Sequence, residues 1–305
     1  MRKLFKALWR VITFPFILVF NIIAYPFRLA RRVGRFLNED LMEERPLMDQ
    51  LTALVSESEV RASFWEHVDV FRMHLLRSVL ALIVTVGISF SFTQKIIAFL
   101  AQPVGGLQNL KAIEVTESVG VFMRVAMLSG IALALPYIAF ELWLFAAPGL
   151  RPRERKFGLI GIPLAAIFFL TGMAFCYFVL LPSALKFLLN FMGIQAELRP
   201  NSYFGFVTGL MFWIGIFFEF PLVIYVLTMI GLVKPQILQQ QWRLAIVIIS
   251  IIAAAITPTV DPVNMGLVML PMTLLYFVSI GLSYVAYAGR QRNAQDSPTP
   301  GVPSP

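Results

Sequence analysis

Charged side chains inside long apolar runs are the residues of this sequence best placed to do chemistry. Glu219 lies in the middle of one run, within Phe217-Phe-Glu-Phe-Pro221, and Arg124 and Glu141 share another. A charge at the centre of a bilayer costs about 2.5–3.5 kcal/mol, so a retained carboxylate is a candidate for a relay, a substrate contact or a partner contact. Glu219, which is deep and is followed by a proline, is the best of these candidates. Arg124 is more simply interpreted as bonding to a neighbouring helix.

The remaining reactive residues are too few for most enzyme chemistry. The sequence has one cysteine, Cys176, and two histidines, His67 and His74. One cysteine excludes an internal disulfide and a Cys-rich metal site, and two histidines leave little for a zinc or haem centre. Both histidines are predicted to precede the first membrane span, so no nucleophile–base pair is expected in the core. No Gly-rich phosphate loop is visible, and we expect no enzyme, no cofactor and no metal.

Composition excludes a soluble globular protein. Of the 305 residues, 58% are hydrophobic and 14% are charged, and the mean hydropathy is +0.78. Ordinary globular domains have about 25% charged residues. The net charge of +8 comes from residues 1–36, which hold eight Lys or Arg and no acid, whereas residues 37–305 hold 17 basic and 17 acidic groups. The excess belongs to one short segment, and nothing predicts a nucleic acid partner for the rest.

Six apolar runs are predicted to be membrane helices. They cover residues 78–94, 119–147, 158–185, 203–232, 243–257 and 263–287. Each of the first four is long enough for a hydrocarbon layer of about 30 Å, whereas the fifth reaches only about 22 Å at 1.5 Å per residue. The sequence therefore predicts an all-α polytopic membrane protein with six transmembrane helices.

Basic residues between the runs predict the orientation, because Lys and Arg accumulate in cytoplasmic loops. Eleven fall on the side that holds both ends of the six-span body, and four fall on the opposite side. Both termini of this body are therefore expected to face the cytoplasm. The eleven are Arg61, Arg72, Arg77, Arg151, Arg153, Arg155, Lys156, Lys234, Arg243, Arg290 and Arg292, and the four are Lys95, Lys111, Lys186 and Arg199.

Three flanking segments are predicted to be separate from the six runs. Residues 1–36 form a basic apolar extension, residues 37–63 a polar acidic linker, and residues 291–305 a Pro-rich tail that we expect to be disordered. Within the extension, the apolar stretch 11–27 has basic clusters on both sides. We interpret it as an interfacial segment held on anionic lipid, because a seventh span would place one of the clusters outside. A spanning segment is the alternative.

Five segments, in order and at matching places on the six-span plan, resemble the TatC family, the multi-spanning receptor subunits of the twin-arginine protein translocase. The resemblance covers residues 64–290, and the segments are highly specific together although each alone is weak. They are Phe64-Trp-Glu-His67 with Arg72, Leu142-Trp-Leu-Phe-Ala-Ala-Pro-Gly-Leu150 followed by Glu154, Gly172-Met-Ala-Phe175, Phe218-Glu-Phe-Pro221, and Thr257-Pro-Thr-Val-Asp-Pro-Val-Asn264.

The resemblance implies a concave, glove-like arrangement of six helices with the last two spans short, in the cytoplasmic membrane of a prokaryote. It implies a receptor that binds Arg-Arg signal peptides of folded proteins at the cytoplasmic face. It also implies TatA and TatB, which are single-span proteins, as partners, a homo-oligomer within a receptor complex, and export driven by the proton-motive force. The main alternative function is a proton-coupled small-solute transporter that uses Glu219, although no internal repeat supports it. A purely structural membrane scaffold is also left open, but it would not explain the cost of Glu219.

Glu154 is the best residue-level match, because the corresponding family position contacts the arginines of the signal peptide. A carboxylate can bind a guanidinium through two parallel hydrogen bonds. The alternative is that Glu154 only offsets the basic residues around it as a solvated loop residue. Arg72 and His67 match the basic residue and the leading histidine of the family's N-terminal motif, with anchoring of a helix at the interface as the alternative.

One departure from the family concerns signal-peptide binding. Where the family usually reads His-Leu-x-Glu-Leu-Arg, this chain reads His67-Val-Asp-Val-Phe-Arg72, so Val70 replaces the signal-binding glutamate. Glu66, Asp69 and Glu141 are the candidates for the second carboxylate. Glu66 lies one turn away from Val70 on the same helix face, and Glu141 stands where the family commonly has glutamine.

Three residues are candidates for translocation or partner contact, namely Glu219, Asp261 and His67. Glu219 matches a recurring polar position in the family's fourth span, where we expect it to help water or partner side chains enter the bilayer. Asp261 lies in the outer turn between the last two spans, where a purely local role in the turn is an equal alternative. Phe277 stands where many relatives carry glutamate, a difference to which we attach no predicted effect.

Overall fold

The computed structural model describes residues 58–149, 152–190, 197–257 and 262–295, and its regular elements within these ranges are all helical. The predicted extension 1–36, most of the linker and residues 296–305 lie outside them. Residues 58–63 of the predicted linker are the first residues of a helix. The elements are α3 (Ser58–Ser89), α4 (Thr93–Leu100), η1 (Gln102–Val104), η2 (Leu107–Asn109), α5 (Glu117–Ala146), η3 (Ala147–Gly149), α6 (Pro152–Phe175), the π-helical η4 (Cys176–Leu180), α7 (Leu181–Asn190), α8 (Pro200–Ile230), α9 (Pro235–Gln240), α10 (Trp242–Ile256) and α11 (Pro262–Gln295).

The six predicted spans are confirmed. The third span continues from α6 through η4 into α7, and α10, with 15 residues, is as short as predicted. Helix α11 was expected to be short as well but has 34 residues, because it continues past its apolar run into the polar stretch that ends at Gln295. The five helices long and apolar enough to cross a membrane cover Val68–Ser89, Glu117–Ala146, Gly158–Leu189, Pro200–Ile230 and Pro262–Gln291.

The first span begins earlier than predicted. Its apolar part is Val68–Ser89 rather than 78–94, and the end of the predicted run belongs to the separate helix α4. Arg72 and Arg77 suggested a later start, but both lie on α3 with exposed side chains. A long basic side chain can reach the polar interface from within a span. His74 therefore lies inside the first span, and the prediction that both histidines precede it is wrong.

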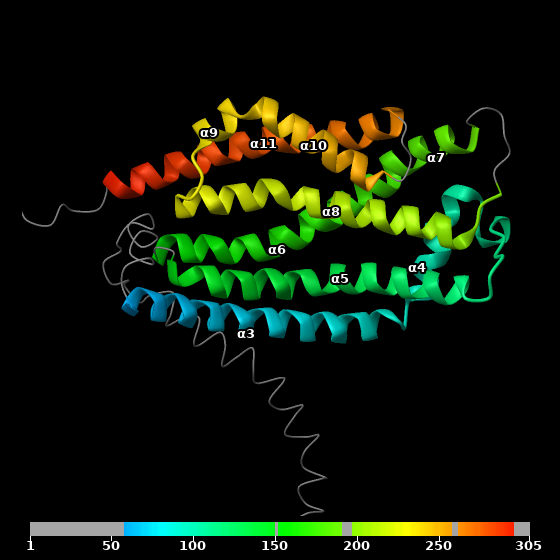
Figure 1. The fold of residues 1–305 in the computed structure, drawn as a ribbon, viewed down its shortest axis with the longest axis horizontal. Helices are drawn as coiled ribbons and strands as arrows, with labels where there is room; N and C mark the ends of the chain where they lie inside the picture. The colour runs from blue at the N-terminus through cyan, green and yellow to red at the C-terminus, as the bar shows by residue number, and fades with distance from the viewer. Residues whose placement is uncertain (1–57, 150–151, 191–196, 258–261, 296–305) are drawn as a thin grey trace, which may run out of the picture.

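Helices α3, α5, α6 and α8 lie alongside one another, and α9, α10 and α11 lie beyond α8 (Figure 1). Helix α3 packs on α5, α5 on α6 and α8, α6 on α8, and α8 on α11. The core is formed mainly by α5, η4, α8 and α11, through side chains such as Val125, Tyr177, Ile214 and Met272. We call the end that holds the start of α3 and the junction of α5 with α6 the inner end, and the opposite end the outer end.

Two glycines allow α6 and α8 to approach each other closely. A Cβ atom added at Gly215 would lie 2.7 Å from the ring of Phe169, and one added at Gly172 would lie 2.9 Å from the Cα of Gly215. Small residues at helix crossings permit such packing in membranes, where the hydrophobic effect does not drive helices together. The crossing lies one helical turn before Glu219 and therefore fixes the position of that carboxyl relative to α6.

Replacing Gly215 with alanine is expected to destabilise the folded protein. The new methyl group would collide with Phe169, and overpacking of this kind costs about 1–3 kcal/mol. The matched control is Gly209→Ala on the same helix, where an added Cβ meets nothing within 4 Å. Thermal unfolding of both variants in detergent measures the difference. Equal midpoints for the two variants would contradict the close crossing.

Helix α4 fills the outer end, where Leu100 and Ala101 are buried. The hydroxyl of Tyr177 donates to the carbonyl of Phe99 at 2.8 Å, and the hydroxyl of Tyr203 donates to the carbonyl of Leu100 at 2.6 Å. These two hydroxyls supply donors to the carbonyl end of α4, where intrahelical partners run out. The third and fourth spans therefore hold α4 in place through one tyrosine each.

Candidate functional site

A buried carboxylate, Glu141, joins α3 to α5 at the inner end. The Nδ1 atom of His74 lies 2.6 Å from Glu141 Oε2, and the hydroxyl of Tyr137 donates to Oε1 at 2.7 Å. Arg77 adds a longer ion pair, with Nη1 3.9 Å from Oε2. Glu141 is 1% exposed. Both carboxylate oxygens thus have hydrogen-bond partners although the residue is buried. Burial of a charged group is costly unless the group is paired in this way.

Two other residues predicted to bind the signal peptide, Asp69 and Arg72, have described side chains, and neither contacts Glu141. Asp69 and Arg72 are exposed on α3, and Val70, which replaces the expected glutamate, is exposed between them. The start of α3 and the start of α6 lie at the same end of the molecule (Figure 1). Three further candidate site residues lie in these helices, but the structure describes only their backbone. They are Glu66, His67 and Glu154.

A buried arginine fixes the junction that carries Glu154. The Nε atom of Arg155 donates to the carbonyl of Ala147 at 2.9 Å, and the side chain is buried. This bond ties the first turn of α6 to the end of α5. Arg155 is therefore not one of the solvated basic residues that the sequence placed around Glu154.

Glu219 lies in the middle of α8, and its carboxyl group approaches the backbone of Phe169 in α6. Its Oε1 atom is buried and has no hydrogen-bond partner. A carboxyl oxygen without a partner inside an apolar span carries a free-energy cost, which a donor from outside would relieve. Asp261, the other candidate for partner contact, lies outside the described residues.

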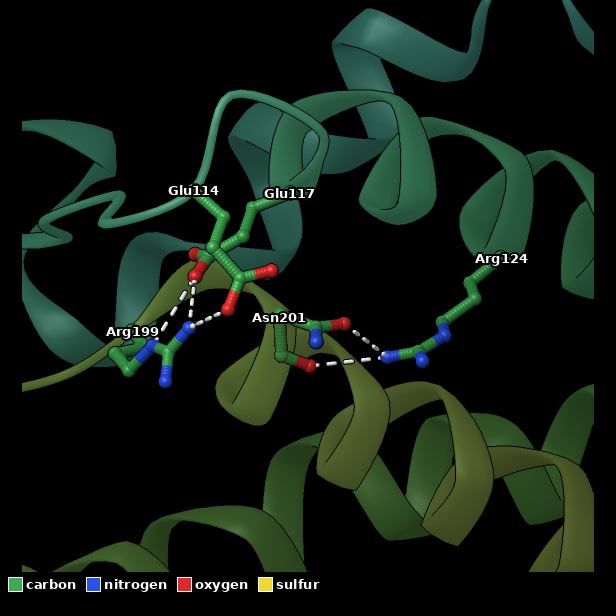
Figure 2. A network of polar contacts seen from close by, with 5 residues as sticks. All are labelled: Glu114, Glu117, Arg124, Arg199 and Asn201. Atoms are coloured by element: carbon green, nitrogen blue, oxygen red, sulfur yellow. Dashed lines mark hydrogen bonds and ion pairs between the residues drawn. The ribbon is translucent and has the colours of Figure 1, made fainter.

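A second polar network occupies the outer end, where Arg199 bridges Glu117, the first residue of α5, and Glu114, which lies just before that helix (Figure 2). Its Nη2 atom lies 2.5 Å from Glu117 Oε1 and 3.0 Å from Glu114 Oε1. Glu117 is buried, whereas Glu114 is exposed. The hydrogen bonds to Glu117 and then Glu114 raise the pKa of the Arg199 guanidinium above its ordinary value.

Arg124 belongs to the same network and bonds to a neighbouring helix, as the simpler interpretation predicted. Its Nη1 atom donates to the backbone oxygen of Asn201 at 3.0 Å and to the Oδ1 atom of the same residue at 2.7 Å (Figure 2). Arg124 and Glu141 have different partners at opposite ends of α5, as predicted from the helical rise. Arg124 therefore helps to hold α8 against α5.

Sequence reasoning missed the partners of the charged residues. The pair His74–Glu141 is separated by 67 residues and the pair Arg199–Glu117 by 82. No local periodicity connects residues so far apart. The one signal available was Glu141 itself, a carboxylate in an apolar span that required a partner on another helix.

The fold and its polar clusters define a class, an α-helical membrane protein that crosses the bilayer six times and carries charged groups at both ends and one carboxyl in mid-span. Within the described ranges, no group of three or more His, Cys, Asp or Glu side chains is arranged to hold a metal ion.

This chain belongs to the TatC family. The family model described as Sec-independent protein translocase protein (TatC) matches residues 66–271. The TatC protein of Carboxydothermus hydrogenoformans is 34% identical over 221 residues, which cover 72% of this chain and 91% of that protein. The TatC protein of Deinococcus radiodurans is 34% identical over 233 residues, covering 73% and 86% of the two chains. A crystal structure described as the twin arginine translocase receptor TatC matches with a TM-score of 0.65 and 32% identity, over 72% of this chain and 99% of that one.

Family membership makes the protein a multi-pass membrane component of a prokaryotic Sec-independent protein translocase. The relatives are named as translocase components. The family therefore favours this function over the small-solute transporter that the sequence had left open.

Proposed function

We propose that this protein is the receptor subunit of a twin-arginine translocase and binds the Arg-Arg motif of signal peptides on folded export substrates. The observation that best supports the proposal is Glu154 in the first turn of α6, within the matched residues 66–271. In the family this position contacts the arginines of the signal peptide. The buried side chain of Arg155 holds the same helical turn on the end of α5, so the backbone that carries the Glu154 carboxylate is fixed in position.

Two arginines are recognised best by two carboxylates, because each guanidinium can form two parallel hydrogen bonds with one of them. Glu154 supplies the first. Asp69, which is exposed on α3, and Glu66, one turn earlier, are the candidates for the second at the same end of the molecule. We place Arg72 on this recognition surface too, and we assign His67 to partner contact.

The inner end faces the cytoplasm in this proposal, so both termini of the six-span body are cytoplasmic. The partners are TatA- and TatB-like single-span proteins, within a receptor complex that holds more than one copy of this chain. The proton-motive force drives export through the cytoplasmic membrane. Glu219 and Asp261 are the residues proposed to meet the partners or the substrate during translocation.

Discrimination between arginine and lysine tests the receptor function. The full chain in lipid nanodiscs should bind a signal peptide with the Arg-Arg pair at least about tenfold more tightly than the same peptide with Lys-Lys, because only a guanidinium pairs with a carboxylate in a bidentate manner. Fluorescence anisotropy of labelled peptides measures both affinities. Equal affinities would overturn the proposal.

Replacing Glu219 with alanine is expected to impair export and the association with single-span partners, because the change removes the acceptor that mid-span donors would use. Export of a reporter and co-purification of the partners measure the two effects. The conservative variant Glu219→Gln retains a carbonyl acceptor and should keep most of the activity. Normal export and association in Glu219→Ala would show that Glu219 has only a structural role.

A further inference from the structure

We propose that the Glu141 carboxylate is a masked binding site for a guanidinium of the signal peptide, and that the peptide displaces the imidazole of His74 from it. The inference rests on the proposed receptor function and adds a step that regulates it. Glu141 is bonded on both oxygens and buried, so a peptide can reach it only after its internal partner has moved.

The chemistry of the exchange favours the guanidinium. In the closed state the imidazole offers Oε2 one hydrogen bond, whereas an arginine offers a carboxylate two parallel N–H groups and a permanent charge. Among the described side chains, the charged and titratable groups bonded or ion-paired to the carboxylate are His74 and Arg77 from α3 and Tyr137 from α5. Arg77 lies at 3.9 Å with a partly exposed side chain, so it flanks the carboxylate without occupying the position of a hydrogen-bonded partner.

The position of Glu141 suits a peptide that already contacts Glu154. Glu141 lies five residues before Ala146, the last residue of α5, which corresponds to about 8 Å along the helix. Glu154 lies in the next helix, in its first turn at the same end. The lid over Glu141 is the inner half of α3, where the rings of Phe71 and Phe145 pack with their centroids 5.2 Å apart.

Helix α3 contacts the rest of the described structure mainly through α5, and its closest backbone approach to α5 lies at the outer end. Most of the apolar side chains described in it, from Val68 to Ser89, are exposed, and its extensive packing is with α5. In its outer half, the hydroxyl of Ser89 donates to the carbonyl of Ala126 at 2.9 Å, and a Cβ at Gly130 would lie 2.8 Å from the Cα of Val86. We call this tight contact the outer tie.

The outer tie acts as the pivot of the opening. Val86 lies 12 residues from His74, or about 18 Å along the helix. With this length of about 18 Å as the lever arm, a tilt of α3 by about 10° around the tie moves His74 about 3 Å away from Glu141. The peptide binds only the open state, in which α3 has moved away from Glu141. Peptide binding therefore shifts the equilibrium toward that state, and any change that favours the open state strengthens peptide binding.

Two variants of the pair are expected to change peptide binding in opposite directions. His74→Phe keeps a ring against Phe145 but removes the imidazole that competes for Glu141, so the Arg-Arg peptide should bind about three- to tenfold more tightly. Glu141→Gln keeps oxygen and nitrogen atoms for His74 and Tyr137 but removes the charge, so binding should weaken about tenfold. The control is Glu197→Gln, at an exposed glutamate of the outer end that contacts neither Glu141 nor the outer tie, and it should leave the affinity for the peptide unchanged.

The experiment uses the full chain in nanodiscs and anisotropy titrations with Arg-Arg and Lys-Lys peptides. Opposite shifts in peptide affinity for His74→Phe and Glu141→Gln support the exchange. Affinity shifts in the same direction, or no shift in either variant, overturn it and leave the pair a structural contact.

A second measurement, of crosslinking, does not depend on these variants. In Phe71→Cys/Phe145→Cys, the Arg-Arg peptide should slow oxidative crosslinking of α3 to α5, and an unchanged rate overturns the opening. A wild-type protein that binds both peptides equally would instead overturn the receptor function itself.

Discussion

Glu154→Gln is expected to reduce the affinity for an Arg-Arg signal peptide by at least about tenfold. The amide has nearly the shape of the carboxylate but loses the charge and one of the two acceptor sites that a guanidinium uses, and hydrogen bonds to charged groups contribute about 1.5–3 kcal/mol. Because the bond from Arg155 to the carbonyl of Ala147 does not involve residue 154, the variant should keep the fold. Anisotropy titration in nanodiscs gives the affinity.

The matched control for this variant is Glu197→Gln. Glu197 is an exposed glutamate at the outer end, where it pairs with Lys111. In the proposed topology it faces away from the cytoplasm, so its loss should leave peptide affinity unchanged. Comparable losses in the two variants, or an intact affinity in Glu154→Gln, would show that Glu154 is a solvated loop residue that only offsets nearby basic groups.

Arg199→Leu is expected to lower the midpoint of thermal unfolding by about 5 °C or more. The substitution leaves the buried carboxylate of Glu117 without its cation, and its Oε2 atom already has no partner. Removing one member of a buried ion pair is far more damaging than removing both, because the remaining charge stays buried.

The exposed pair Lys111–Glu197 provides the control for Arg199. Both of its side chains face solvent, and exposed pairs contribute little. Lys111→Leu should therefore shift the midpoint by no more than about 1–2 °C. The double variant Arg199→Leu/Glu117→Leu should recover most of the loss, since no unpaired charge remains. A shift of Arg199→Leu no larger than that of Lys111→Leu would contradict the role assigned to the outer network.

The spans could be predicted from the sequence because apolar length is a local property. The runs at 203–232 and 243–257 differ from α8 and α10 by at most three residues at either end. The first span could not be bounded in the same way. Arg72 and Arg77 lowered the hydropathy at its start, although their side chains reach outward from a continuous helix. The end of α3 at Ser89 and the start of α4 were hidden within one apolar run, because both helices are apolar there.

The candidate site could be predicted only where a motif marks it. Glu154 was found through the segments shared with the family, and Glu141 and Arg124 were found because charge is rare inside spans. The sequence could not show that Glu141 faces His74, or that Glu117 meets Arg199, since such pairs depend on how distant helices pack. Those contacts distinguish a carboxylate that is open to a peptide from one that is masked.

The length of α10 has a consequence for the lipids around the protein. Its 15 residues rise about 22 Å, and the side chains of Leu244, Val247 and Ile251 are exposed along it. The lipid acyl chains next to α10 must match a shorter hydrophobic length than those next to α8. Each ångström of mismatch costs a fraction of a kcal/mol. Phospholipids with short or unsaturated tails should therefore gather along this side. The annulus of lipid around the protein would then be uneven in composition, with its thinnest part beside α10.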